Sequence, residues 1–394
     1  MDSLLKNLNE AQKKAVLHKD GPLLVLAGAG AGKTKAIAHR VAYLVSQGVN
    51  PENILAITFT NKAANEMKER IMFLLKPQII NSKLQTPFVS TFHSLGAHIL
   101  RRHGKYIGIT KNFTILDKED SLGMIKEAIK ELNIDPKQFQ PAKMSSIISR
   151  QKGELAEVEE FLAQAGGEFF PRTLGMIWKK YEDILVEHKS LDFDDLITRT
   201  VLLLQKNKEV REFYQNLWKY ILIDEYQDTN KSQYEFSKIL AEKHKNICAI
   251  GDMDQAIYSW RGADFRNIIN FENEYPEHIT IIFEENYRST KTILEAAAKV
   301  IEKNKMRKPK KLISKKESGS EIILFEAMSE EEEANFVAHQ IKDLLKKKNQ
   351  TTEIAVLYRA NFQSRILEEV CLKHNIPYHV VGTQFYERKE IKDI

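Results

Sequence analysis

A glycine-rich loop at residues 27–34 constrains this chain more than any other feature of its sequence. It reads Ala-Gly-Ala-Gly-Ala-Gly-Lys-Thr and lies between a short apolar run, 22–26, and a stretch that places Ile37, Val41 and Leu44 on one helical face. A buried strand, such a loop and a helix together let backbone N–H groups converge on phosphate oxygens at the helix N-terminus. The loop therefore predicts a nucleoside triphosphate site within an α/β fold.

The individual loop residues predict how the phosphates are held. Lys33 would reach the terminal phosphates as a point charge, and the Thr34 hydroxyl would ligate Mg²⁺. The first position departs from the usual pattern because Ala27 replaces glycine, although a small residue still allows close packing there. A flexible glycine linker would not explain a Gly-Lys-Thr triplet between a strand and an amphipathic helix. The expected nucleotide contacts are Ala27, Gly28, Ala29, Gly30, Ala31, Gly32, Lys33 and Thr34.

Length and composition fit a multidomain globular protein. The 394 residues suggest two or three domains, and 43% hydrophobic residues are enough to form full cores. Cys248 and Cys371 lie in apolar surroundings without metal-binding spacing, so we expect reduced, packed cysteines. The N-terminus lacks an apolar signal core and no stretch nears the roughly 20 apolar residues that span a bilayer, so we expect a cytoplasmic protein. A net charge of +5 permits a polyanionic partner without requiring one.

Apolar, β-branched runs alternate with helical patterns along most of the chain. These runs occupy residues 54–59, 88–92, 220–223, 247–250 and 280–283. The alternation predicts a parallel, doubly wound sheet with ligands at the carboxyl ends of its strands. Residues 109–190 are instead helix-rich and highly charged, which indicates an inserted helical domain.

The alternation of apolar runs and helical patterns is interrupted a second time after Ser289. Eight basic residues fall within 303–316, which we interpret as a solvated helix end or linker rather than a dedicated DNA patch. Apolar runs at 322–325 and 354–358, with a helical pattern between them, then predict a second α/β domain. The last residues, 390–394, have the pattern of the first turn of another helix.

Two acids, Asp224 and Glu225, follow directly after the apolar run 220–223. In phosphoryl transfer, one carboxylate at such a strand end can hold Mg²⁺ and its neighbour can polarise an attacking water. A pair of exposed acids at a strand end is common in isolation, but the P-loop earlier in the chain favours the hydrolase interpretation. We therefore assign Mg²⁺ to Asp224 and water activation to Glu225.

Together these segments resemble the UvrD/Rep/PcrA family of superfamily 1 DNA helicases, in the family's order and through nearly the whole chain. Tyr226 stands where phenylalanine is more usual, and Met253 replaces a residue that is often acidic. The segments that carry the resemblance are 8–12, 57–64, 91–94, 192–196, 224–230, 251–263 and 286–289.

The resemblance implies a P-loop, RecA-like parallel sheet as the first motor domain. That domain would be discontinuous, formed by residues 1–108 and 191–288, with the helical domain at 109–190 inserted into it. Residues 289–394 would form a partial second RecA-like domain.

The resemblance also implies roles around the nucleotide. Gln12 would read the adenine edge, Tyr287 would stack on adenine, and Gln255 would sense the terminal phosphate. Arg288 would donate to that phosphate from across the domain cleft. The expected ATP contacts outside the loop are Gln12, Arg40, Tyr287 and Arg288, and the expected catalytic residues are Lys33, Glu225, Gln255 and Arg288.

Single-strand contacts are implied at aromatic and polar side chains. Stacking on an aromatic face is worth about 1–3 kcal/mol per base, and Trp260, just beyond a strand end, is better placed for a ligand than for a core. Phe92 and Phe193 are expected to pack in the core, and His93 can equally satisfy a local carbonyl. The expected DNA contacts are Thr58, Phe59, Asn61, His93, Tyr258, Trp260 and Arg261.

The implied function is an ATP- and Mg²⁺-dependent DNA helicase that moves 3′ to 5′ on single-stranded DNA and unwinds junctions with duplex. Its pathway, in DNA repair or replication, its partner proteins and its oligomeric state are open. A Thr-Arg-Ala segment, which supplies a second arginine clamp in the family, is not found before Ile394. This motivates an alternative, an ATP-gated single-strand-binding module with little turnover in a C-terminally truncated chain. A third interpretation is the motor part of a helicase-nuclease subunit, although no appended nuclease is visible.

Overall fold

A computed structural model of the chain describes residues 2–79, 86–347 and 353–381. The chain divides into two compact units, Met1–Gly319 and Ser320–Ile394. Among the described residues, none of the helices combines the length and apolar character needed to cross a membrane.

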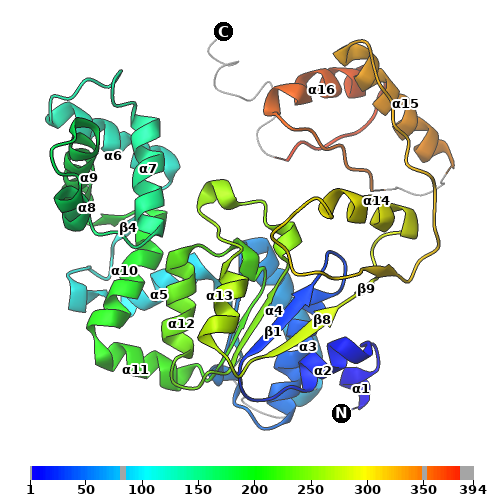
Figure 1. The fold of residues 1–394 in the computed structure, drawn as a ribbon, viewed down its shortest axis with the longest axis horizontal. Helices are drawn as coiled ribbons and strands as arrows, with labels where there is room; N and C mark the ends of the chain where they lie inside the picture. The colour runs from blue at the N-terminus through cyan, green and yellow to red at the C-terminus, as the bar shows by residue number, and fades with distance from the viewer. Residues whose placement is uncertain (1, 80–85, 348–352, 382–394) are drawn as a thin grey trace. The chain divides into compact units, whose positions relative to one another are not determined.

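A six-stranded parallel sheet forms the centre of the first unit (Figure 1). Its spatial strand order is β3-β2-β6-β7-β1-β8, so the chain crosses between non-adjacent strands. All of the strands that the apolar runs of this unit predicted are present, which confirms the α/β fold class. They are β1 (Leu23–Ala27), β2 (Ile54–Thr58), β3 (Phe88–Thr91), β6 (Tyr220–Ile223), β7 (Ile247–Gly251) and β8 (Ile279–Phe283).

Two hydrophobic cores flank this sheet, because successive side chains of a strand point to opposite faces. In β1, Leu24 and Leu26 join one core, while Leu23 and Val25 join the other. Phe92 lies in the first core, as predicted. The first core is covered by α5 (Phe92–His103), α10 (Phe193–Lys206), α11 (Lys208–Leu217), α12 (Lys231–Ala241) and α13 (Asn267–Glu274), and the second by α3 (Lys33–Ser46) and α4 (Asn61–Ile79), with α1 (Asp2–Leu5) and α2 (Glu10–Leu17) beside α3.

Four helices occupy the stretch predicted to be helical and inserted. They pack around a core of their own that includes Phe139, Trp178 and Tyr181. Two short strands, β4 (Thr114–Ile115) and β5 (Ser190–Leu191), pair in parallel where the chain enters and leaves this region. The helices are α6 (Lys118–Glu131), α7 (Pro141–Gly153), α8 (Val158–Gln164) and α9 (Phe169–Glu187).

The segment after β8 remains part of the first unit. Strand β9 (Glu285–Asn286) pairs with β10 (Ile313–Ser314), and α14 (Lys291–Ile301) connects them. The boundary between the compact units therefore lies at residues 319 and 320, whereas the sequence predicted a new domain from residue 289. Contacts with the rest of the first unit account for the difference, since Asn286 of β9 donates to the Ala29 carbonyl and Lys310 pairs with Asp252.

The second unit contains two long helices, α15 (Glu330–Lys347) and α16 (Ser364–Lys373), which pack through Ala338 and Val370. The helical pattern predicted here is confirmed, but the apolar runs at 322–325 and 354–358 are not strands in the structure. Leu324 is 95% exposed and Leu357 is 92% exposed. A strand needs a neighbour to accept and donate its backbone hydrogen bonds, and the described residues of this unit form no such pair. The predicted turn at 390–394 lies outside the described residues.

Candidate nucleotide site and nucleic-acid interface

The glycine-rich loop connects β1 to the N-terminus of α3, as the sequence predicted. Gly30 and Gly32 have φ values of 70° and 84°, a region that favours glycine. A Cβ atom would also lie 2.6 Å from the Arg288 Cβ at position 30, and 2.7 Å from the Gln12 Nε2 at position 32. Glycine is therefore required at both positions, and the loop presents backbone N–H groups at a helix N-terminus in the way that suits a phosphate group.

Lysine, threonine and two carboxylates converge beside this loop. Lys33 Nζ lies 2.6 Å from Glu225 Oε2, and Thr34 Oγ1 donates to Asp224 Oδ2 at 3.2 Å. Burial, reinforced by the charge of Glu225, raises the pKa of Asp224 to about 6. A hydroxyl and a carboxylate oxygen this close are the hard donors that Mg²⁺ takes when it also binds phosphates. The residues present therefore fit a magnesium nucleotide.

Glu225 has an unusual backbone conformation, with φ 51° and ψ 45°. Residues other than glycine rarely adopt this left-handed region, and such strain is concentrated at functional sites. Gln227, which is 1% exposed, holds the Glu225 carboxylate through an Nε2 hydrogen bond of 2.9 Å. Its Oε1 accepts from the backbone N–H of Asp252, also at 2.9 Å. Gln227 thus joins the acidic segment to the segment after β7, a role that its sequence position alone did not reveal.

Gln255 completes the cluster from the segment that follows β7. Its Oε1 lies 3.5 Å from Lys33 Nζ, and its Nε2 donates to Asp252 Oδ2 at 2.6 Å. Lys33, Thr34, Asp224, Glu225 and Gln255 therefore meet at the carboxyl ends of β1, β6 and β7, as the sheet topology predicts for a ligand site.

Gln12 and Tyr287 lie together on one side of the loop. Gln12 forms a capping box with Asn9 at the start of α2, and its Nε2 donates to the Ala31 carbonyl at 2.9 Å. Asn9 Nδ2 in turn donates to the Tyr287 hydroxyl at 2.9 Å, and Tyr287 is 42% exposed. Arg288 is exposed and follows directly, against Gly30. Three of the four residues expected to contact ATP outside the loop are therefore adjacent to it.

Arg40 does not join this cluster. It lies farther along α3, is 3% exposed, and donates to the backbone carbonyls of Ala15 at 2.8 Å, His18, and Lys19 at 3.3 Å. These carbonyls belong to the end of α2, where helix geometry leaves acceptors without partners. The structure therefore gives Arg40 a role in packing α2 against α3, and this corrects the expectation that it contacts ATP.

An aromatic pair lies beyond the ends of β2 and β7. The Phe59 and Tyr258 rings stack with centroids 5.6 Å apart and an interplanar angle of 16°. Trp260, two residues farther on, is 72% exposed. Thr58 is buried at the end of β2, and Asn61 is exposed at the start of α4. The side chain of Arg261 lies outside the described part of the structure.

Phe193 corrects a prediction, because it is 51% exposed rather than packed in the core. It occupies the first position of α10, directly after the capping residue Asp192. Its ring meets His93 edge-on at 5.6 Å. Burial lowers the pKa of His93, which favours the neutral imidazole. These two rings therefore form a second aromatic surface on the same unit.

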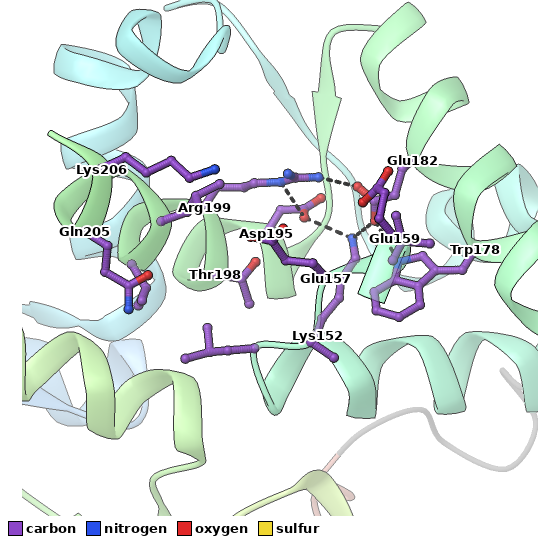
Figure 2. A pocket seen from close by; sticks show the side chains of 15 residues that line it. Lys152, Glu157, Glu159, Trp178, Glu182, Asp195, Thr198, Arg199, Gln205 and Lys206 are labelled. Atoms are coloured by element: carbon purple, nitrogen blue, oxygen red, sulfur yellow. Dashed lines mark hydrogen bonds and ion pairs between the residues drawn. The ribbon is translucent and has the colours of Figure 1, made fainter. Parts of the chain in front are cut away.

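A buried ion network joins the inserted helices to α10 (Figure 2). Lys152 of α7, which is 4% exposed, lies 2.7 Å from Glu182, 2.8 Å from Asp192 and 2.9 Å from Asp195. Arg199 also pairs with Glu182. Lys152, Glu182, Asp195 and Arg199 line a cavity of about 230 Å³, whose lining also contains apolar side chains. The sequence did not predict the network, because its members come from three helices and a loop that are far apart in the chain.

The charges in this network perturb one another. Burial would raise the pKa of Asp192, but the charge and hydrogen bond of Lys152, together with hydrogen bonds from the Asp195 backbone and Tyr181, hold that pKa below its ordinary value. Burial and the neighbouring Asp192 raise the pKa of Asp195 to about 7. Because Asp192 and Asp195 also cap α10 reciprocally, Lys152 fixes the helix end that carries Phe193.

Comparison with known proteins agrees with this geometry. Residues 8–276 match the UvrD/REP helicase N-terminal domain, and residues 281–394 match the UvrD-like helicase C-terminal domain. The whole chain is 48% identical to the ATP-dependent DNA helicase PcrA of Staphylococcus epidermidis and 47% identical to the protein of that name from Staphylococcus aureus. It covers 54% and 53% of those proteins, so the chain spans about half the length of these curated relatives.

The family resemblance carried by the motifs is therefore confirmed by matches that cover most of the chain. The described residues also form the parallel sheet and the loop that the motifs require. The chain belongs to the UvrD/REP helicase family.

Proposed function

We propose that this chain supplies the ATP-hydrolysing and strand-gripping parts of a motor that moves 3′ to 5′ along single-stranded DNA and unwinds the duplex ahead of it. One observation carries the proposal. The segment that follows β7 holds both Gln255, beside Lys33, and Tyr258, stacked on Phe59, with Trp260 two residues beyond. A single short segment thus contacts the nucleotide site at one end and presents aromatic rings at the other.

The nucleotide side is arranged for hydrolysis. The loop amides and Lys33 would bind the phosphates, while Thr34 and Asp224 would hold Mg²⁺, which supplies charge neutralisation when bound. Glu225 would accept a hydrogen bond from the attacking water and orient it, since its carboxylate is already held by Lys33 and Gln227. Gln255 would bind the terminal phosphate through its amide, and Arg288 and Tyr287 would close over the loop from the segment after β8.

Coupling to DNA would follow from the shared segment. When Gln255 shifts toward a terminal phosphate, the backbone that carries Tyr258 and Trp260 shifts with it. The bases stacked on these rings would then be gripped or released according to the nucleotide, which is a form of conformational gating.

This function is tested by measuring ATP hydrolysis with and without single-stranded DNA. Stimulation of ATP hydrolysis by DNA is expected. A motor that moves 3′ to 5′ should displace streptavidin faster from a strand biotinylated at its 5′ end than from a strand biotinylated at its 3′ end. A chain that binds neither nucleotide nor single strands would contradict the proposal. ATP-dependent strand binding without turnover would instead support the gated binding module.

Replacing Trp260 with alanine is expected to weaken single-strand binding by about 1–3 kcal/mol, because one exposed stacking face is removed. Nucleotide affinity should be unchanged, since Trp260 lies at the far end of the segment from Lys33. Fluorescence anisotropy of a labelled oligonucleotide gives the DNA affinity, and a fluorescent ADP analogue gives the nucleotide affinity. Phe73→Ala is the matched control, because Phe73 is 76% exposed on α4 and belongs to neither aromatic surface. Equal losses in the two variants would contradict a specific role for Trp260.

A further inference from the structure

The basic segment 303–316 is folded against the rest of the first unit, whereas its charge pattern predicted a solvated helix end or linker. Four of its cations pair with acids of that unit: Arg307 with Asp254, Lys308 with Glu272, Lys310 with both Asp252 and Asp254, and Lys315 with Glu285. The Lys310 side chain is 6% exposed. Lysine is almost never buried unless it is paired, so this placement requires a specific partner.

Lys310 binds the same carboxylate as Gln255 does. Its Nζ donates to Asp252 Oδ1 and lies 2.6 Å from Asp254 Oδ2. The other Asp252 oxygen, Oδ2, accepts from Gln255 Nε2 at 2.6 Å. Asp252 itself is 3% exposed, so a buried anion is shared between Lys310 and the side chain proposed to sense the terminal phosphate.

The segment also lies against the phosphate loop. A Cβ at Gly28 would lie 2.5 Å from the Leu312 side chain, and β10 pairs with β9 immediately afterwards. Asn286 of β9 donates to the Ala29 carbonyl at 2.5 Å. The chain then continues into Ser320, where the second unit begins.

We infer that Lys310 is a positioning residue that allows Gln255 to leave Asp252 when nucleotide binds. This inference rests on the proposed function of the same site. When Gln255 turns toward a phosphate, Asp252 loses one of its two side-chain donors and keeps Lys310 together with the backbone N–H of Asp254. A buried carboxylate that lacks a neutralising partner is costly. Lys310 keeps that carboxylate neutralised, so the Gln255 segment can respond to the nucleotide while segment 303–316 stays attached to it.

Without Lys310, Asp252 has no neutralising cation on its Oδ1 and retains the Gln255 amide and the Asp254 backbone N–H as donors. Gln255 is then the side chain that stabilises this carboxylate, so it is held away from the phosphate. The consequence is a loss of coupling between the two ligands, while the binding of each ligand alone is preserved. Coupling is measured as the ratio of single-strand dissociation constants with and without a non-hydrolysable ATP analogue. We expect a ratio of at least about fivefold in the wild-type chain and below about twofold in Lys310→Met.

Three further variants make this test specific. Lys310→Arg keeps a cation and should restore most of the coupling, and Lys311→Met removes an exposed neighbouring lysine and should change nothing. Arg307→Met removes a cation that contacts Asp254 but not Asp252, and it should also retain coupling. If Lys310→Met does not fold, Lys310→Gln serves instead, and its coupling should again fall below that of Lys310→Arg.

Each outcome decides between the alternatives. Full coupling in the folded Lys310→Met variant would overturn this inference and leave the proposed function standing. Weakened DNA binding without nucleotide would show a merely structural role and would also overturn it. If the wild-type chain binds single-stranded DNA equally well with and without the ATP analogue, the proposed coupling itself is refuted.

Discussion

Replacing Glu225 with glutamine is expected to lower ATP turnover by about 10²–10⁴-fold, the range typical for loss of a general base. The amide has nearly the same shape and can still accept hydrogen bonds from Lys33 and Gln227, which contact Glu225 Oε2 at 2.6 Å and 2.9 Å. It cannot take a proton from an attacking water. Nucleotide affinity should therefore stay within a few-fold of wild type, while the chemical step slows.

Single-turnover hydrolysis of labelled ATP, with single-stranded DNA present, resolves even a slow chemical step. A fluorescent ADP analogue measures binding in the same preparation, and Glu209→Gln on the exposed face of α11 is the matched control. If Glu225→Gln hydrolyses ATP at the wild-type rate, Glu225 is not the base. If it loses nucleotide affinity as well, its main role is to hold Lys33.

Replacing Lys152 with methionine is expected to destabilise the first unit by about 3–5 kcal/mol, because removing one partner leaves buried charges uncompensated. Lys152 contacts three carboxylates, Glu182, Asp192 and Asp195, and no other residue contacts all three in the described structure. The effect should be local. Native-state hydrogen exchange should show faster opening of α7, α9 and the start of α10.

The deficit of Lys152→Met should depend on pH with a defined sign. Without Lys152, burial dominates, so the folded-state pKa values of Glu182 and Asp192 rise above their unfolded values. The pKa of Asp195, which is already raised to about 7, rises further. A carboxylate whose pKa is raised by folding lowers the free energy of unfolding at pH values where it is ionised in the folded state. This loss of stability disappears as the pH falls and the carboxylate becomes protonated. The difference from wild type should therefore shrink from about pH 8 to about pH 5. In the wild type, by contrast, the lowered pKa of Asp192 contributes stability that is lost as pH falls through that pKa.

Lys206→Met provides the control for both measurements. Lys206 lines the same cavity but is exposed and lies outside the ion network. It should leave exchange rates and their pH dependence unchanged. A Lys152→Met protein with wild-type protection of α7 and α9 would show that apolar packing alone holds these helices to α10.

Much of the site was predictable because it is built from short contiguous segments. The loop from Ala27 to Thr34, the acids after β6 and the position of Gln255 each follow a strand, and parallel strands bring their carboxyl ends to one edge. Local sequence was misleading where burial decided the outcome. The sequence predicted that Arg40 contacts ATP, but this arginine is buried against α2. The sequence also predicted that Phe193 packs in the core, but this phenylalanine is exposed at the start of α10.

The sequence by itself determined the fold class, the family, and the residues that meet at the nucleotide edge. Hydrophobic periodicity and the motifs are local properties, so they can be read without knowing the three-dimensional contacts. Only the tertiary structure decided which charges are buried and paired. In the sequence, Lys152 and Lys310 look like other surface lysines. Their roles arise because folding buries them beside acids that are distant in the chain. Charges in a low-dielectric interior are costly unless they are paired, so each lysine neutralises the acids around it.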